Sequence, residues 1–201
     1  MKLLIIGATG RVGRQVRTIA EQRGVNVRLF VRSGDGRHPD LAEGDVRNKR
    51  DVLAAMTGAS GVISCLSTED GGTLIEGTRN IAEAMRERGT TRLVTIGTAG
   101  ILESSAEPGL LRYRSSENRR TTTAAAAEHH QAYEYLKESG LEWTIVCPTR
   151  LVEGERTGVY RTLADKLPFG GTTISFADTA EFALNEYFSR QFVHARAGIA
   201  Y

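Results

Sequence analysis

Residues that form cross-links or bind metals are scarce in this sequence. Cys65 and Cys147 are its two cysteines, and each lies inside or at the end of an apolar run. Two cysteines without a regular spacing make neither a disulfide framework nor a zinc motif. The adjacent His129 and His130 would point about 100° apart on a helix, and no cysteine or carboxylate cluster accompanies them. We therefore expect buried thiols, no structural disulfide and no bound metal.

The sequence also lacks an excess of one charge and long apolar runs. Lysine and arginine number 26 against 24 aspartates and glutamates, and the net charge of +2 creates no basic field for nucleic acid or a membrane surface. No apolar stretch approaches the roughly 20 residues that cross a bilayer. The run after Met1 ends at a glycine turn rather than in a signal-peptide pattern. We expect a cytoplasmic protein, monomeric or dimeric, whose partner is a small molecule.

Short apolar runs alternate with helical patterns along the chain. With 201 residues, 40% of them hydrophobic, the chain can bury one core but is too short for two full domains. Apolar residues recur at helical spacing over 12–20 and 74–85. Runs typical of buried parallel strands cover 3–6, 27–31, 61–64, 93–96 and 143–146, with a weaker one near Gly44. This alternation predicts an α/β fold, a single domain over 1–201 with a doubly wound parallel sheet.

Two segments interrupt the alternation. Residues 101–123 contain Ser, Pro, Gly and four arginines, at 112, 114, 119 and 120, which predicts a mobile loop over the carboxyl ends of the strands. Residues 151–175 are rich in glycine and predict an extended excursion, so that 151–201 forms a small extension on the substrate side. The alanine run 124–127 favours a helix. Asp178, followed by Glu181, predicts the N-cap of a last helix.

A glycine turn, in the stretch GATGRVG, joins the first predicted strand to the first predicted helix. Its first glycine permits a tight turn, the second lets a pyrophosphate approach the backbone, and the third lets the helix close onto the sheet. The helix N-terminus then offers N–H groups and a partial positive charge to phosphates. The stretch predicts a dinucleotide site of the Rossmann type, with a tight turn and no ligand as the alternative. The residues of this predicted cofactor site are Gly7, Thr9, Gly10, Arg11, Val12 and Gly13.

The end of the second predicted strand distinguishes NADP from NAD. In this fold an acidic residue about 20 positions after the glycine turn usually selects the 2′-hydroxyl of NAD. Arg32 and Ser33 occupy that place here, and a guanidinium with a hydroxyl can bind a 2′-phosphate. We therefore expect NADP as the cofactor, with NADPH preferred over NADH. In the alternative, Arg32 is a solvated strand-end residue and Asp35 holds the ribose of NAD.

Several stretches make the sequence resemble the atypical short-chain dehydrogenases, and among them the NmrA-like group that includes flavin reductase, also called biliverdin-IX-beta reductase. They are GATGRVG, FVRS, GDV at 44–46, EGTRNIAEAM at 76–85 and ESGLEWTIVCPT at 138–149, and they span most of the chain. The resemblance implies that Asp45 and Val46 border the adenine. The other cofactor positions that it implies are Leu66, Ser67 and Thr68 along the pyrophosphate and ribose, and Pro148 and Thr149 near the nicotinamide.

For the reacting end, the resemblance implies Thr98, Arg150 and His129 as catalytic residues. Thr98 follows the strand 93–96, where flavin reductases keep a hydroxyl that would orient the nicotinamide or the acceptor; a threonine bonded to backbone is the alternative. Arg150 stands where flavin reductase has a histidine, and it can bind an anion but cannot donate a proton at neutral pH. His129 matches a histidine of the relatives that would face the site, with a solvated helix histidine as the alternative.

These features favour an NAD(P)H-dependent oxidoreductase that reduces flavins or quinone-like planar acceptors by direct hydride transfer. The chain is short for a large substrate domain, so we expect a shallow and permissive pocket. One alternative is a non-catalytic NADP(H) redox sensor of the NmrA type. It is favoured because Tyr133 and Lys137 have the spacing of the usual catalytic pair but end their helix rather than begin it. The other alternative is an NAD-dependent epimerase- or dehydratase-like protein.

Overall fold

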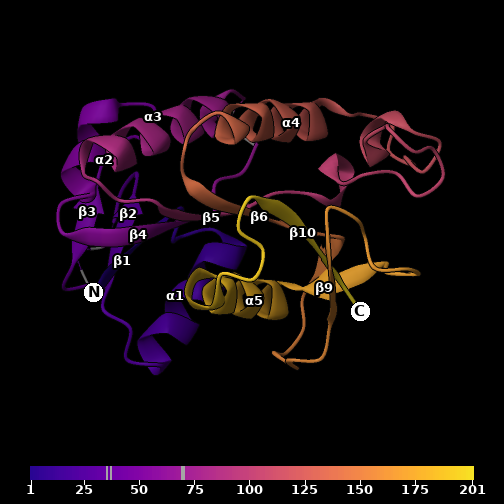
Figure 1. The fold of residues 1–201 in the computed structure, drawn as a ribbon. Coiled ribbons are helices and arrows are strands. Elements are labelled where there is room, and N and C mark those ends of the chain that lie inside the picture. Colours follow the sequence, from indigo (N-terminus) through magenta and orange to yellow (C-terminus); the bar gives the residue numbers. More distant parts are fainter. Residues whose placement is uncertain (35, 37, 69–70) are drawn as a thin grey trace.

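A sheet of eight strands runs through the centre of the protein (Figure 1). The structure, a computed structural model, describes residues 1–34, 36, 38–68 and 71–201. Within these residues every neighbouring pair of strands in the sheet is parallel except β10 and β8. In sheet order the strands are β3 (Leu41–Glu43), β2 (Val27–Val31), β1 (Lys2–Ile6), β4 (Ala59–Ser64), β5 (Arg92–Ile96), β6 (Glu142–Pro148), β10 (Ala195–Ala200) and β8 (Arg161–Ala164).

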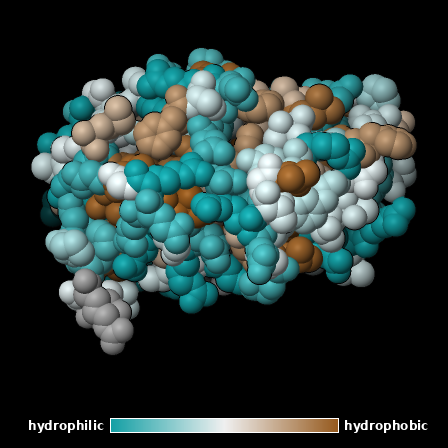
Figure 2. All heavy atoms as spheres, turned by 90° about the horizontal axis from the view of Figure 1, so that it is seen from below, coloured by the Kyte–Doolittle hydropathy of each residue, from teal (hydrophilic) through white to brown (hydrophobic). Residues whose placement is uncertain are grey.

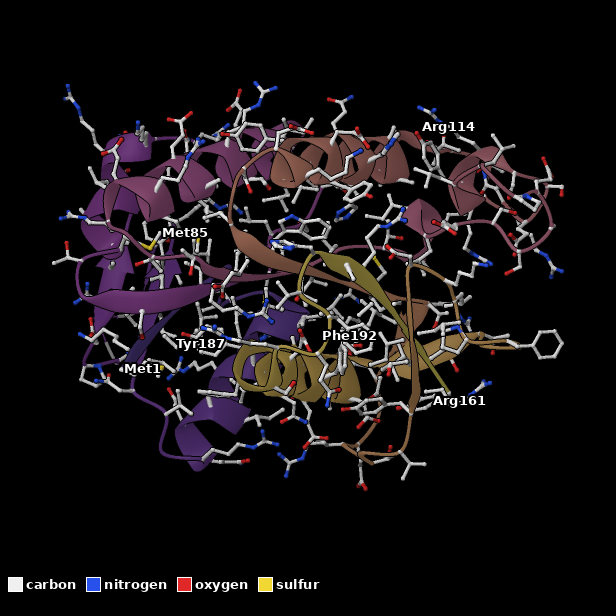
Figure 3. All side chains as sticks on the ribbon, in the orientation of Figure 1. Met1, Met85, Arg114, Arg161, Tyr187 and Phe192 are labelled. Atoms are coloured by element: carbon white, nitrogen blue, oxygen red, sulfur yellow. The ribbon has the colours of Figure 1, made fainter. Side chains whose placement is uncertain are left out.

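Helices cover both faces of the sheet. Val16 of α1 and Tyr187 of α5 belong to one core cluster, whereas Met85 of α3 and Leu136 of α4 belong to another. Figure 3 shows Met85 and Tyr187 on opposite sides of the sheet. The helices are α1 (Arg11–Gln22), α2 (Lys49–Ala55), α3 (Thr73–Glu87), α4 (Ala124–Lys137) and α5 (Phe176–Ser189). The predicted doubly wound α/β fold is confirmed, and the weak strand predicted near Gly44 is β3, which ends one residue before it.

The outer surface of α1 and α5 is mostly hydrophilic. Figure 2 shows the molecule from this side, where polar side chains divide the hydrophobic atoms into separate areas. The apolar sides of the two helices are used in the core instead, where Ile19, Ala20 and Ala183 are buried. In the part of the chain that the structure describes, no helix combines the length and the apolar character that crossing a membrane requires.

The segment 101–123 has a structure of its own beyond the N-terminal end of α4. It contains the short 3-10 helix η2 (Arg112–Arg114) and follows η1 (Ala99–Ile101). The Glu117 carboxylate accepts a hydrogen bond from Ser104 Oγ and pairs with Arg112. Arg114, at the outer end of α4 in Figure 3, donates to the Tyr113 hydroxyl. Two of the four arginines in this segment are therefore held by their neighbours, and the expected mobility of the segment stays a prediction.

The region 150–175 contains short strands where an extended excursion was expected. β7 (Arg150–Val152) pairs in parallel with β9 (Thr173–Ser175), and β8 lies between them in the sequence and joins the large sheet. α5 begins at Phe176 with Ser175 as its N-cap, whose Oγ accepts from Asp178 N–H at 2.9 Å. The prediction of Asp178 as the N-cap is wrong, because the serine three residues earlier supplies the capping oxygen. The Asp178 carboxylate instead accepts from the hydroxyls of Thr157 and Tyr201.

The strand β10 has no counterpart among the predicted strands. Its sequence, ARAGIA, consists mostly of small residues and lacks the Val, Ile and Leu run typical of a buried parallel strand. Gly198 has a specific reason to be there, because a Cβ at this position would lie 2.1 Å from the carbonyl oxygen of Lys166. The chain that leaves β8 therefore crosses β10 in close contact, and small residues permit the crossing.

A buried ion pair joins β5 to α5. Arg92 Nη2 lies 2.9 Å from Glu186 Oε1, and the two side chains are 1% and 0% exposed. Arg92 also donates to Thr144 Oγ1, and Glu186 accepts from the N–H of Phe192. Burial lowers the pKa of Arg92, and the negative charge of Glu186 opposes that shift. Inside the protein, each charge thus offsets the cost of removing the other from water.

We expect Glu186→Ala to destabilise the protein by about 3–5 kcal/mol, because the substitution leaves the Arg92 guanidinium buried without its counter-ion. Urea unfolding followed by far-ultraviolet circular dichroism measures the change. The matched control is Glu21→Ala on the exposed side of α1, where Glu21 pairs with Arg17 in solvent and its loss costs far less. Equal losses for the two variants would contradict the role assigned to the buried pair.

Candidate dinucleotide site

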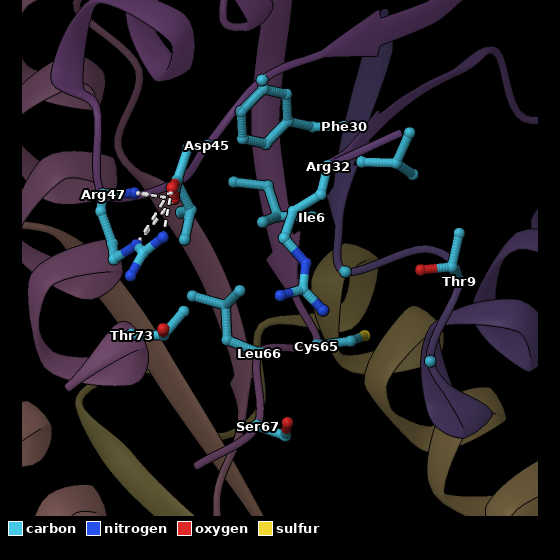
Figure 4. A pocket seen from close by; sticks show the side chains of 15 residues that line it. Ile6, Thr9, Phe30, Arg32, Asp45, Arg47, Cys65, Leu66, Ser67 and Thr73 are labelled. Carbon is cyan, nitrogen blue, oxygen red and sulfur yellow. Dashed lines mark hydrogen bonds and ion pairs between the residues drawn. The ribbon is translucent and has the colours of Figure 1, made fainter. Parts of the chain in front are cut away.

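A cavity opens at the carboxyl ends of β1, β2, β3 and β4. The strand order reverses between β1 and β4, and ligands of doubly wound sheets bind at such a reversal. The cavity encloses about 180 Å³. Figure 4 shows the residues that line it, namely Ile6, Gly7, Thr9, Gly10, Phe30, Val31, Arg32, Gly44, Asp45, Val46, Arg47, Cys65, Leu66, Ser67 and Thr73.

The turn between β1 and α1 requires glycine at two of its positions. Gly7 has a φ of 74°, and a Cβ there would lie 2.8 Å from the carbonyl oxygen of Cys65. A Cβ at Gly13 would lie 2.1 Å from the carbonyl oxygen of Gly7. Neither approach is possible with a side chain, since both obstacles are backbone atoms. The close packing places the N-terminus of α1 directly at the wall of the cavity.

The first turn of α1 has no capping side chain and no acidic residue. Gly10 is the N-cap residue, and the first intrahelical hydrogen bond runs from Arg14 N–H to its carbonyl oxygen. The N–H groups of Arg11, Val12 and Gly13 precede that bond and have no acceptor within the helix. The Val12 side chain is buried in the core, so only its N–H can serve a ligand. A pyrophosphate fits this turn, because these donors and the helix dipole favour an anion.

Two arginines and an aspartate shape the other end of the cavity. Figure 4 shows the Arg32 side chain reaching from the end of β2 into the middle of the cavity. Arg47 and Asp45 form a facing wall, with Arg47 Nη2 2.6 Å from Asp45 Oδ2. Hydrogen bonds from the side chain and the backbone of Arg47 lower the pKa of Asp45. Ser33 is exposed beside Arg32, and Asp35, the predicted alternative, lies outside the described residues.

The predicted reacting end lies at the carboxyl ends of β5 and β6. Thr98 and Pro148 each come two residues after a paired position, Ile96 on β5 and Val146 on β6, so they stand side by side at this edge. Thr98 Oγ1 accepts a long hydrogen bond, 3.4 Å, from the N–H of Gly100. Its hydroxyl proton has no acceptor among the described residues. Thr98 therefore caps the chain after β5 and keeps a donor at the edge of the sheet.

Two buried hydroxyl groups near this edge lack a partner within the described residues. They are Ser64 Oγ, at the end of β4, and Thr149 Oγ1, directly after β6. An unpaired buried hydroxyl costs about 1–3 kcal/mol, so such groups usually bond a ligand or a water. Their positions at the ends of strands in one sheet fit a ligand that extends from the glycine turn toward β6.

His129 lies on the buried side of α4. Ala126, one turn earlier, contacts the chain after β5, since a Cβ at Gly100 would lie 3.1 Å from Ala126 Cβ. Leu136, two turns later, is fully buried. Residues three and seven positions apart share one side of a helix, so His129 faces the same way. Burial lowers the pKa of His129 to about 4, and its ring has no hydrogen-bond partner among the described residues. The half-buried imidazole is therefore neutral at pH 7.

Two arginines without a carboxylate partner among the described residues flank the site. Arg150 is exposed at the start of β7. Arg11, the first residue of α1, places its guanidinium carbon 4.6 Å from the centre of the Phe176 ring at the start of α5. Tyr133 and Lys137 lie elsewhere: Tyr133 packs against Trp143 near the beginning of β6, at the opposite edge of the sheet.

The two thiols are free, and their surroundings disfavour the thiolate form. Burial raises the pKa of Cys65 and of Cys147 to about 12 each. A thiolate is the reactive form of cysteine, and neither group forms it at neutral pH. Cys65 lines the cavity and Cys147 lies beside the Thr98 N–H, so neither position brings nucleophilic cysteine chemistry to the site.

Eight of the residues predicted for the cofactor line the cavity together: Gly7, Thr9, Gly10, Arg32, Asp45, Val46, Leu66 and Ser67. Those predicted for the cofactor that do not line it are Arg11, Val12, Gly13, Ser33, Thr68, Pro148 and Thr149. The sequence analysis assigned no cofactor role to the other seven lining residues, which are Ile6, Phe30, Val31, Gly44, Arg47, Cys65 and Thr73. Phe30 lies within a predicted strand and Thr73 just before a predicted helical pattern, so only their position at the edge of the sheet distinguishes them.

These features define the class of protein: a doubly wound α/β domain whose glycine turn forms a dinucleotide site at the reversal of strand order. The chain belongs to the NAD(P)H-binding family, which matches residues 7–188. This match confirms the NAD(P)-binding domain that the resemblance to the atypical short-chain dehydrogenases implied.

Solved structures of other proteins are similar to this chain over its whole length. A protein from Burkholderia pseudomallei, provisionally described as exported, is 29% identical with a TM-score of 0.90, covering 100% of both chains. A Streptococcus pneumoniae protein provisionally described as an NADH-flavin reductase is 24% identical with a TM-score of 0.84, covering 100% of this chain and 99% of its own. A short-chain dehydrogenase/reductase from Veillonella parvula, in complex with NADP, is 18% identical with a TM-score of 0.80, covering 100% and 94%.

The burial of His129 predicts a pH-dependent loss of stability. The unfolded chain binds a proton at this residue near about pH 6.5, whereas the folded protein binds it only near about 4. Stability from the neutral imidazole is therefore complete above about pH 6.5 and is lost as the pH falls toward about 4. In urea unfolding, we expect the wild type to lose more stability than His129→Gln between about pH 7 and 5. An NMR titration that moves the His129 ring resonances near neutral pH would contradict this assignment.

Proposed function

We propose that the protein is an NADPH-dependent oxidoreductase that reduces small planar acceptors, such as flavins or quinones. The observation that carries the proposal is the continuity of the edge formed by the strand ends. It runs from Arg32 after β2, past the uncapped N-terminus of α1 after β1, to Thr98, Thr149 and the neutral His129. The relatives described as a flavin reductase and as an NADP complex support this choice.

The residues of the cavity would hold the dinucleotide. The N–H groups after Gly10 bind the pyrophosphate, and Arg32 binds the 2′-phosphate that distinguishes NADPH from NADH. Val46 and Phe30 contribute apolar surface for the adenine. When bound, NADPH supplies a hydride to the acceptor. The protein's part in this chemistry is to fix the relative positions of cofactor and acceptor.

At the predicted reacting end, the side chains would orient the nicotinamide and the acceptor and would polarise the acceptor. Thr98 can donate its hydroxyl proton to the carboxamide or to the acceptor, and the unpaired Thr149 hydroxyl supplies a second polar contact. His129 is neutral, so it acts as a hydrogen-bond donor to an acceptor carbonyl rather than as a strong acid. Arg150 can bind an anionic group of the acceptor, which distinguishes this chain from flavin reductase, where the resemblance places a histidine.

A non-catalytic NADP(H) sensor is the second candidate, and one observation favours it. Tyr133 and Lys137 pack near the beginning of β6, so they are absent from the edge where the nicotinamide would lie. With both thiols protonated as well, Thr98 and His129 are the main groups available for chemistry at that edge. A sensor needs only to distinguish the oxidised from the reduced cofactor by affinity.

The oxidoreductase proposal predicts that NADPH is consumed only when protein and acceptor are both present. The measurement is the loss of the near-ultraviolet absorbance of NADPH, with a flavin, a quinone and a biliverdin in separate reactions. We expect His129→Gln to slow the reaction about tenfold or more, because one polarising donor is lost. His130→Gln is the matched control, since His130 bonds Tyr113 on another side of the same helix. Tight NADPH binding without consumption across the acceptors would favour the sensor.

The cofactor assignment predicts a change of preference in Arg32→Asp. A carboxylate at this position repels the 2′-phosphate and accepts a hydrogen bond from a 2′-hydroxyl, so we expect NADPH affinity to fall by more than about tenfold while NADH affinity is kept. Titration of each reduced cofactor by its fluorescence gives both dissociation constants. Unchanged constants for both cofactors would refute the assignment of the 2′-phosphate to Arg32.

A further inference from the structure

The beginning of α3 is built into the wall of the dinucleotide cavity. Thr73, its first residue, lines the cavity (Figure 4). One turn later, a Cβ at Gly77 would lie 2.7 Å from Leu66 Cδ1 and 3.0 Å from Val46 Cγ2, so the helix packs closely on both. These two residues also line the cavity, and Asn80 Nδ2 donates to the Val46 carbonyl oxygen at 2.9 Å. The position of α3 and the shape of the cavity are therefore fixed together.

The first turn of α3 receives its cap from another helix. Gly72, its N-cap residue, supplies no side-chain hydrogen bond. Instead, Glu128 Oε1 on α4 accepts a hydrogen bond from Leu74 N–H at 3.2 Å. A carboxylate at the start of a helix is favoured by the helix dipole as well as by the hydrogen bond. Glu128 therefore joins α4 to the helix that forms the cavity wall.

The first half of α4 buries little apolar surface. Its N-cap residue, Thr123, makes no capping hydrogen bond with its side chain, and Ala124 and Ala125 are exposed. The buried residues of α4 are Ala132 and Leu136, which both belong to its second half. A helical segment with little buried apolar surface opens easily unless specific contacts hold it. The place of this half therefore depends on its polar contacts.

Glu128 directly precedes His129, the residue assigned to the predicted reacting end. Side chains of adjacent helical residues point about 100° apart, so Glu128 can accept from Leu74 while His129 faces the chain after β5. The next residue, His130, bonds the Tyr113 hydroxyl and thus ties α4 to the segment 101–123 instead. The contact of Glu128 is therefore the one that relates the place of His129 to the wall of the cavity.

We propose that Glu128 is a positioning residue: by capping α3 from α4, it holds His129 at a fixed place relative to the dinucleotide cavity. The inference rests on the proposed role of His129 in reducing the acceptor and extends that role to a residue outside the cavity. Without this contact, the first half of α4 opens more often and exposes the imidazole to water. The cavity keeps its shape, because Gly77 and Asn80 still hold α3 against it.

The first test follows the ring of His129 by an NMR titration, without cofactor or acceptor. Burial lowers the pKa of this imidazole to about 4, and exposure to water would raise it toward about 6.5. We expect a rise of at least about 1 in Glu128→Ala and no rise in Glu128→Gln, whose side-chain oxygen can still accept from Leu74 N–H. Loss of a negative charge beside a histidine would by itself lower the pKa, so a rise identifies exposure.

Two further variants separate position from charge. Glu128→Asp keeps the charge but is one carbon shorter, so it should raise the pKa of His129 as Glu128→Ala does, and it replaces that variant if Glu128→Ala does not fold. The matched control is Glu134→Ala, which removes the same charge from an exposed part of α4, where Glu134 pairs with Lys137. This control should leave the titration of His129 unchanged.

The second test measures NADPH consumption with an acceptor that the wild type reduces. We expect kcat to fall about fivefold or more in Glu128→Ala while the dissociation constant of NADPH stays within about twofold, because the cavity is kept and the imidazole is displaced. Glu128→Gln should restore most of the rate.

An unchanged titration of His129 in Glu128→Ala and Glu128→Asp would overturn the proposal. An equal rise in Glu134→Ala would also overturn it, since that result would reveal a general loosening of α4. The titration needs neither NADPH nor an acceptor, so its outcome is separate from that of the proposed function. If the titration responds as expected but the wild type reduces no acceptor, the positioning of His129 stands and the oxidoreductase proposal fails.

Discussion

The structure depends on the contact between the carbonyl oxygen of Gly7 and the helix that starts a few residues later. A side chain at Gly13 would enter that carbonyl group, so α1 can pack against the end of β1 only because this position lacks one. The contact brings an uncapped helix terminus to the reversal of strand order, where β1, β2 and β4 end together. The positive end of the helix dipole then lies in the cavity that these strand ends enclose. The charged side chains that line the cavity are arranged around this fixed point.

The central part of the fold could be predicted from the sequence, because its strands are short Val, Ile and Leu runs that few other structures accommodate. β1, β2, β4, β5 and β6 all follow this rule, and a weak strand was predicted beside Gly44, where the three residues of β3 end. β10 could not be predicted from the sequence. Its glycine and alanines are small because another segment of the chain crosses the strand closely, and that crossing exists only in the folded protein. The prediction of the N-cap of α5 was wrong for a local reason. Ser175 and Asp178 can both cap a helix, and only the position of the strand β9 decides between them.

The residues of the candidate site likewise fall into two groups: those that could be predicted before the structure was known and those that could not. The glycine turn and Arg32 at the end of β2 could be predicted, because their spacing is set by the fold. Leu66 and Ser67 at the end of β4 were implied by the resemblance to the atypical short-chain dehydrogenases. Arg47 could not be predicted, since its place in the wall of the cavity comes from hydrogen bonds to the carboxylate of Asp45 and belongs to no motif. His129 was correctly placed on a helix, but its burial and low pKa follow from the packing of α4 on the chain after β5. Charge pairing and desolvation are properties of the folded state, and a single sequence does not display them.

All the residues that line the cavity lie between positions 6 and 73, whereas Thr98, His129, Thr149 and Arg150 come later in the chain. The cavity and the predicted reacting end are thus encoded in consecutive, non-overlapping parts of the sequence. The second part also contains the folded 101–123 segment and the antiparallel edge of the sheet. Substitutions after β5 can therefore reshape what lies above the strand ends while the residues that line the cavity stay the same. An arrangement of this kind lets one nucleotide-holding unit be inherited intact while the remainder of the chain diverges.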